Sequence, residues 1–185
     1  MSANSLIPRQ QVHTWSEDIG NQVTNHEASL TRLLKAQRRL TRFLEENQGV
    51  MTPQSAGVGL YLLGVVIRMF DLAGGRLRSA TWEQIRAASG RVQGVAGDLL
   101  PPDKDFPQRV RNVDWRAQPH ILDEALMALF EREKKDEEED LNKDEAMQIF
   151  FLLWVATEVL DANWKPQSNF SGEKSYVFTP IEEDN

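Results

Sequence analysis

The chain has 185 residues, a mass of 21.1 kDa and a formal net charge of −7, with 41% hydrophobic and 26% charged residues. These values fit one globular domain and exclude wholesale disorder. The chain has no cysteine, which excludes disulfides, thiolate metal sites and a cysteine nucleophile. Absence of cysteine also suits a reducing compartment, so we expect a cytoplasmic protein. The longest apolar run, 56–67, is too short to span a bilayer, and we expect no transmembrane segment.

Charge is distributed unevenly along the chain. Residues 1–118 carry 15 Lys+Arg and 11 Asp+Glu, whereas residues 119–185 carry 6 and 17. Opposite charge in two parts of one chain favours internal neutralisation or head-to-tail association. A net acidic protein is a poor candidate for nucleic-acid binding, so nucleic acid is an unlikely partner on charge alone.

Hydrophobic residues recur at helical spacing in several segments, and almost no segment alternates as a strand would. The predicted helices are 24–48, 53–72, 81–100, 119–130 and 142–164. The second opens with Thr52 as N-cap and a proline at the first helical position, and the third opens with a capping box from Thr81. The fifth is apolar on every face and is expected to be central. The sequence therefore predicts an all-α fold, a compact bundle of about five helices.

The domain organisation follows from these helices. We expect an N-terminal arm over 1–23, weakly helical or extended, and a single bundle domain over 24–164. The bundle contains a long loop at 101–119 with four prolines, and an irregular C-terminal tail covers 165–185. A structureless loop of this length in a compact domain is often functional.

Two segments are candidate partner-binding surfaces. The first belongs to the long loop and carries arginine and tryptophan, which are enriched at interface hot spots. Alternatively, the tryptophan closes the end of the bundle and the arginines face water. The second is an acidic segment that either steers a basic partner or is a solvated helix end. The candidate residues are Arg109, Arg111, Trp115 and Arg116 in the loop, and Glu137, Glu138 and Glu139 in the acidic segment.

Polar residues on otherwise apolar helices are candidates for a ligand pocket between the second and fifth helices. They are Tyr61, Arg68 and Asp71 on the second helix and Glu158 on the fifth. We expect Arg68 to contact Asp71, with Glu158 as a further candidate partner, because acids in a last helical turn gain from a nearby cation. The structural interpretation is an ion pair that sets helix register.

Small residues follow one face of the second and third predicted helices. Gly57 and Gly64 lie on the second, and Gly90, Gly94 and Gly97 on the third. Interior glycine costs a helix about 0.5–1 kcal/mol relative to alanine, so several on one face need a reason. Either the two helices cross tightly, or one stripe stays open as a groove for a partner helix or a small ligand.

The first predicted helix carries a basic surface around its apolar stripe, formed by Arg32, Lys35, Arg38, Arg39 and Arg42. Such a surface can bind nucleic acid or anionic lipid, although a solvated face is the commoner explanation. No aromatic residues interleave with these bases to stack on nucleotides.

Known catalytic and metal-binding motifs are incomplete. None of the three histidines has a glutamate three positions before it, and the chain has neither a nucleophile elbow nor a phosphate-binding loop. We expect no cofactor and no metal, and the sequence leans away from an enzyme. The main hypothesis is a non-enzymatic protein-interaction module, as adaptor, accessory subunit or inhibitor, with self-association as an option. The alternatives are a helical-bundle enzyme or small-ligand-binding protein that uses the pocket above, and a weak binder of nucleic acid or anionic surfaces through the first helix.

Overall fold

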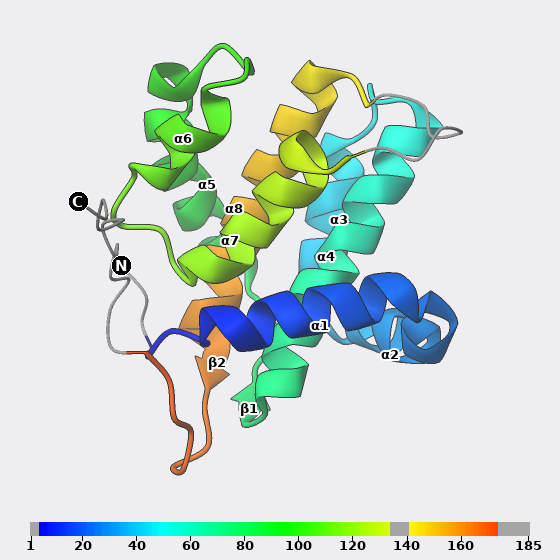
Figure 1. Cartoon of the computed structure of the whole chain (residues 1–185), viewed down its shortest axis with the longest axis vertical. Coiled ribbons are helices and arrows are strands. Elements are labelled where there is room, and N and C mark those ends of the chain that lie inside the picture. Colours follow the sequence, from blue (N-terminus) through cyan, green and yellow to red (C-terminus); the bar gives the residue numbers. More distant parts are fainter. Residues whose placement is uncertain (1–3, 134–140, 174–185) are drawn as a thin grey trace, which may run out of the picture.

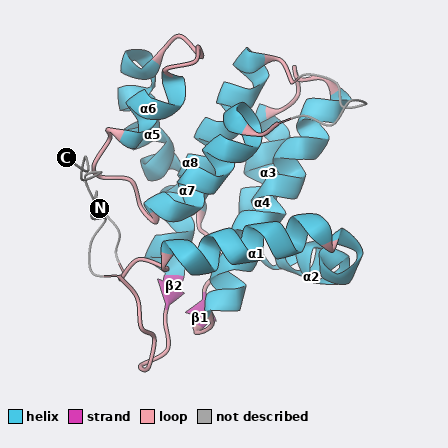
Figure 2. Cartoon of the chain, in the orientation of Figure 1, coloured by secondary structure: helices cyan, strands magenta, loops and turns pink. Residues whose placement is uncertain are grey.

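The computed structural model describes residues 4–133 and 141–173. In these residues the chain forms eight α-helices, one π-helical turn and a two-stranded ribbon (Figures 1 and 2). The elements are α1 (Arg9–Asn21), α2 (Val23–Ala36), α3 (Arg38–Asn47), α4 (Pro53–Ala73), β1 (Arg76–Leu77), α5 (Trp82–Leu99), α6 (Phe106–Arg111), α7 (Pro119–Leu126), η1 (Met127–Glu131), α8 (Lys143–Asn163) and β2 (Trp164–Lys165). The predicted all-α class is confirmed, with eight helices in place of about five.

The centre of the bundle is formed by α4 and α8, which pack against each other. α5 and α7 also pack on α8, while α2 and α3 cover α4. α1 crosses in front of α4 at a steep angle and also contacts α7 (Figure 1). From Leu153 to Asp161, every side chain of α8 is buried, so the expectation of a central fifth helix is confirmed.

α4 is the one described helix whose length and apolar composition would allow it to cross a membrane. Core helices of globular proteins meet the same two criteria. Half of the apolar window in α4 is buried inside the bundle, against its helical neighbours.

The predicted helix 24–48 is broken at Gln37, which separates α2 from α3. Gln37 leaves helical geometry, with φ −101° and ψ 46°. Its buried side chain donates to the carbonyl oxygen of Arg78 at 3.0 Å and accepts from the backbone N–H of Ala80 at 3.0 Å. These two bonds reach a segment more than 40 positions away, and no local periodicity contains that information.

Two further helices lie where the sequence predicted a weakly helical or extended arm and a structureless loop. In the arm, α1 is a full helix that buries Val12 and Ile19 against the bundle. In the long loop, α6 buries Phe106, whose ring lies 5.0 Å from the ring of Phe130 and 5.9 Å from that of Phe151. In both helices few apolar residues recur at helical spacing. Their stability comes from tertiary packing, which a local sequence pattern does not reveal.

The described parts of the two terminal segments lie side by side (Figure 1). Leu6 and Glu173 exchange backbone hydrogen bonds of 2.7 and 2.8 Å. The ring of Phe170 packs edge-on against Trp164 at 5.1 Å. The predicted tail is thus, as far as residue 173, an irregular segment fastened to the arm.

One interpretation of the glycine stripes, that the second and third predicted helices (α4 and α5) cross tightly, is wrong. α5 packs on α8 through Ile85, Ala88 and Val92, which lie on the face opposite its glycines. A Cβ added at Gly90 or Gly94 would meet nothing within 4 Å. The glycine stripe of α5 is an exposed surface of the bundle.

Candidate partner-binding groove

The break at Gln37 creates a groove on the outer side of α2, α3 and α4. Because the chain changes direction there, α3 runs beside α4 (Figure 1). The hydroxyl of Thr41 caps the end of α2, donating to the carbonyl oxygen of Leu34 at 2.8 Å. The resulting hollow measures about 650 Å³, within the range of ligand sites.

The floor of the groove is apolar and its rim is basic. Leu34 and Leu60, both half-buried, line the floor. The rim is formed by the cations Lys35, Arg38 and Arg42 together with Glu45, all exposed. All three cations line the same hollow, although the break at Gln37 separates Lys35 from the other two.

Two of the rim cations have no counter-ion in the described part of the chain. Arg42 donates to Glu46 at 2.7 Å, a pair exposed to solvent. Lys35 and Arg38 form no ion pair with any described residue. Unpaired cations beside exposed apolar surface favour a partner that supplies both carboxylates and apolar side chains.

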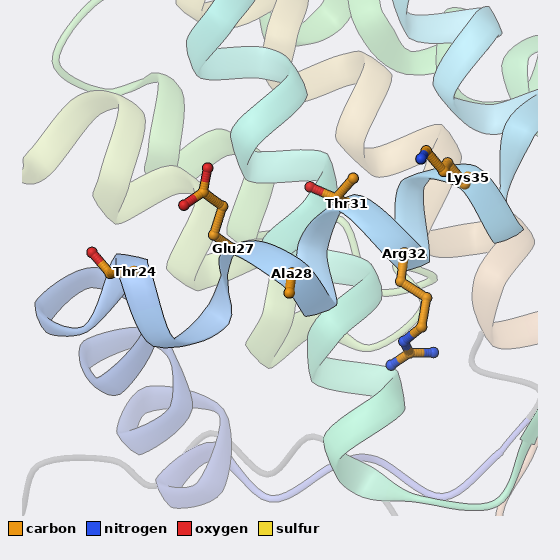
Figure 3. Close-up of a pocket in the computed structure, with 6 residues that line it drawn as sticks. All are labelled: Thr24, Glu27, Ala28, Thr31, Arg32 and Lys35. Atoms are coloured by element: carbon orange, nitrogen blue, oxygen red, sulfur yellow. The ribbon is translucent and has the colours of Figure 1, made fainter.

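The groove continues along α2 as a shallower hollow of about 690 Å³, which shares Thr31 and Lys35 with the first. Figure 3 shows its six lining residues, all from α2: Thr24, Glu27, Ala28, Thr31, Arg32 and Lys35. The side chains of Glu27 and Arg32 diverge and point to opposite sides of the helix. The hollow is therefore a surface track along one helix, suited to an elongated partner and unlike an enclosed catalytic pocket.

The residues predicted to line a ligand pocket do not meet at one place. Arg68 forms the expected ion pair with Asp71, which also accepts from Arg32 of α2 at 3.4 Å. Tyr61 is half-buried on α4, and burial raises the pKa of its hydroxyl. None of the hollows described in this chain is lined by these residues or by Glu158.

Glu158 instead joins the segment before α7 to the core. It accepts from the backbone N–H of Ala117 at 2.8 Å and from the indole N–H of Trp154 at 3.1 Å. Burial raises the pKa of Glu158, against the effect of these two hydrogen bonds. The suggested contact with Arg68 is not present among the described residues.

The loop residues predicted to bind a partner make contacts within the chain. Trp115 stacks on Trp154 with ring centroids 5.1 Å apart, as expected for a residue that closes the end of the bundle. Arg116 is buried and donates to Asp123 at 2.8 Å. Arg109 donates to Leu99 O and Asp103, and Arg111 pairs with Glu131. The alternative that these arginines only face water is therefore wrong. The other predicted partner-binding residues, Glu137, Glu138 and Glu139, lie outside the described residues.

Sequence reasoning missed Gln118, a buried polar side chain of this loop. It occupies the left-handed region, with φ 46° and ψ 59°, and is buried. Its side chain accepts from Ile7 N at 2.9 Å and donates to Asp161 Oδ1 at 2.7 Å and Ser5 O at 3.2 Å. It therefore ties the arm to α8. The only local signal was its place directly before Pro119, which biases a residue away from helix.

In the described part of the chain, no three His, Asp or Glu side chains are placed to hold a metal ion. Each histidine pairs with a carboxylate: His13 with Glu124 at 2.9 Å, His26 with Asp18 at 2.8 Å, and His120 with Glu173 at 2.8 Å. These pairs join α1 to α7, α2 to α1, and α7 to the C-terminal segment.

No family model matches the chain, and neither a curated protein nor a solved structure matches it. Its function is therefore inferred from the geometry of its own surfaces.

Proposed function

We propose that this protein is a non-enzymatic interaction module that binds an acidic, amphipathic helical segment of a partner protein in the α2–α3–α4 groove. The observation that carries the proposal is the apolar floor of Leu34 and Leu60 beside Lys35 and Arg38, two cations that form no ion pair with a described residue. A helix whose apolar residues recur every three to four positions matches an elongated groove of this kind. Its flanking carboxylates would lie against the rim.

A protein segment fits the groove better than a nucleic acid or a membrane. The floor is apolar, and no aromatic residue lines it to stack on a base. Glu45 lies on the rim and Glu27 on the continuing track, so neither a nucleic acid nor an anionic membrane would meet a continuous row of cations there.

The test uses a designed helical peptide as probe, with leucines on one face and glutamates on the other, labelled for fluorescence anisotropy. A scrambled peptide of the same composition serves as its control. We expect the amphipathic peptide to bind and the doubly substituted K35E/R38E protein to bind it at least about tenfold more weakly. Leu60→Asp is expected to weaken binding of the amphipathic peptide to a similar extent, because it places a charge on the apolar floor of the groove.

The matched control is R86E/R91E, which reverses two exposed arginines of α5 that do not line the groove. It changes the net charge of the protein by the same amount as K35E/R38E. Equal loss of affinity in both double variants would mean that the loss comes from the more negative net charge of the protein and not from the rim cations, which refutes the proposal. Equal binding of the scrambled peptide, or tighter binding of single-stranded RNA or anionic vesicles, also refutes the proposal.

A further inference from the structure

A second hollow lies at the ribbon that joins the ends of α4 and α8. β1 and β2 pair antiparallel, and their register sets Arg76 opposite Lys165. Gly75, just before β1, has φ 90° and lies so close to β2 that a Cβ would overlap the carbonyl oxygen of Lys165. Glycine at this position thus permits the approach that brings the two basic residues together.

The hollow measures about 350 Å³ and is lined by basic and amide side chains. The basic residues are Arg76, Arg78 and Lys165, and no carboxylate lines the hollow. All three are exposed, and none forms an ion pair with another described residue. Three cations gathered without a counter-ion repel one another, so a bound anion would stabilise the arrangement.

The walls of the hollow are held in place by hydrogen bonds. The amide of Asn163 donates to Gln84 at 2.8 Å, and Gln84 donates back at 3.3 Å. Gln84 also completes the capping box with Thr81, which fixes the first turn of α5 beside the hollow. Trp164 is buried and donates its indole N–H to Gly74 O at 2.8 Å. The exposed basic side chains therefore surround a fixed polar wall, a preorganised setting for an anion.

We propose that this pocket binds the phosphate group of a small phosphorylated molecule. Two guanidinium groups and an ammonium match the charge and the several oxygens of a phosphate monoester, because arginine can bind phosphate oxygens in pairs. The volume falls in the range of small-molecule sites and leaves room for an organic group attached to the phosphate. The site uses residues separate from those of the α2–α3–α4 groove, so it does not depend on the function proposed above.

Isothermal titration calorimetry with inorganic phosphate, glycerol 3-phosphate and adenosine monophosphate tests this assignment. We expect at least one of the two esters to bind more tightly than inorganic phosphate, because its organic group adds contacts. Arg78→Gln and Lys165→Gln should each weaken the binding at least about tenfold, since each removes a charge-assisted hydrogen bond. Thermal melts of the same samples check that the variants are folded.

Arg91→Gln is the matched control, because Arg91 is exposed on α5 and does not line the hollow. It should bind the esters as the unsubstituted protein does. The assignment is overturned if no ester binds at about millimolar concentration, or if Arg91→Gln weakens binding as much as Arg78→Gln. Tighter binding of a phosphoserine peptide than of either ester would also overturn it, in favour of a protein ligand.

Discussion

Replacement of Gln118 should release the N-terminal arm and destabilise the whole domain. In Gln118→Ala the buried N–H of Ile7 loses its acceptor, and Asp161 and Ser5 O each lose a donor. A neutral hydrogen bond contributes about 1 kcal/mol net and one to a carboxylate about 1.5–3 kcal/mol, so we expect a loss of about 3–5 kcal/mol. Urea unfolding followed by circular dichroism measures this loss.

A second substitution separates the side chain from the backbone. Gln118 has φ 46°, a conformation that costs alanine about 1 kcal/mol or more but costs glycine little. Gln118→Gly should therefore be more stable than Gln118→Ala by roughly 1 kcal/mol, although it removes the same hydrogen bonds. Hydrogen exchange of the Ile7 amide should accelerate in both variants. The proposed role of Gln118 is refuted if Gln118→Ala lowers the free energy of unfolding by less than about 1 kcal/mol. It is also refuted if Gln118→Gly is less stable than Gln118→Ala.

Three further predictions follow from other contacts. Arg116→Met should lower the free energy of unfolding by about 1.5–3 kcal/mol, because it removes a charge-assisted hydrogen bond to Asp123 while Arg111 stays 3.7 Å from that carboxylate, and peptide binding at the groove should not change. The hydrogen bond that His13 donates to the Glu124 carboxylate raises the pKa of His13, so this pair stabilises the fold fully below the unfolded pKa of 6.5 and less as pH rises through the raised value. His13→Gln should therefore lower the melting temperature more at about pH 5.5 than at about pH 8.5, and an equal effect at both would contradict the assignment. Gly90→Ala and Gly94→Ala should each stabilise the protein by about 0.5–1 kcal/mol in urea titrations, since each Cβ would enter open space.

The features that were predicted correctly depend on residues that lie close together in the sequence. Thr52 accepts from Ser55 N with Pro53 after it, and Thr81 forms its capping box with Gln84, as expected from residue type and spacing alone. The Arg68–Asp71 ion pair could also be predicted from the sequence, because the two residues lie three positions apart on one helix.

The errors arose where distant chain decides local structure. The break at Gln37 depends on hydrogen bonds to the segment after β1, and α1 and α6 depend on packing against the bundle. The candidate groove follows from that break, so the sequence identified its cations as a basic helix face but not the hollow beside them. Similarly, the pocket at the ribbon joins residues almost 90 positions apart, whose proximity has no sequence signature.

The position of α8 constrains how the protein is made. This helix is the last of the described helices to leave the ribosome, yet it supplies the middle of the core. Until it emerges, α4, α5 and α7 lack the surface on which they pack, and their apolar faces are exposed to other nascent chains. Folding during translation must therefore be completed late, and the growing chain is an expected client for chaperones that shield hydrophobic segments.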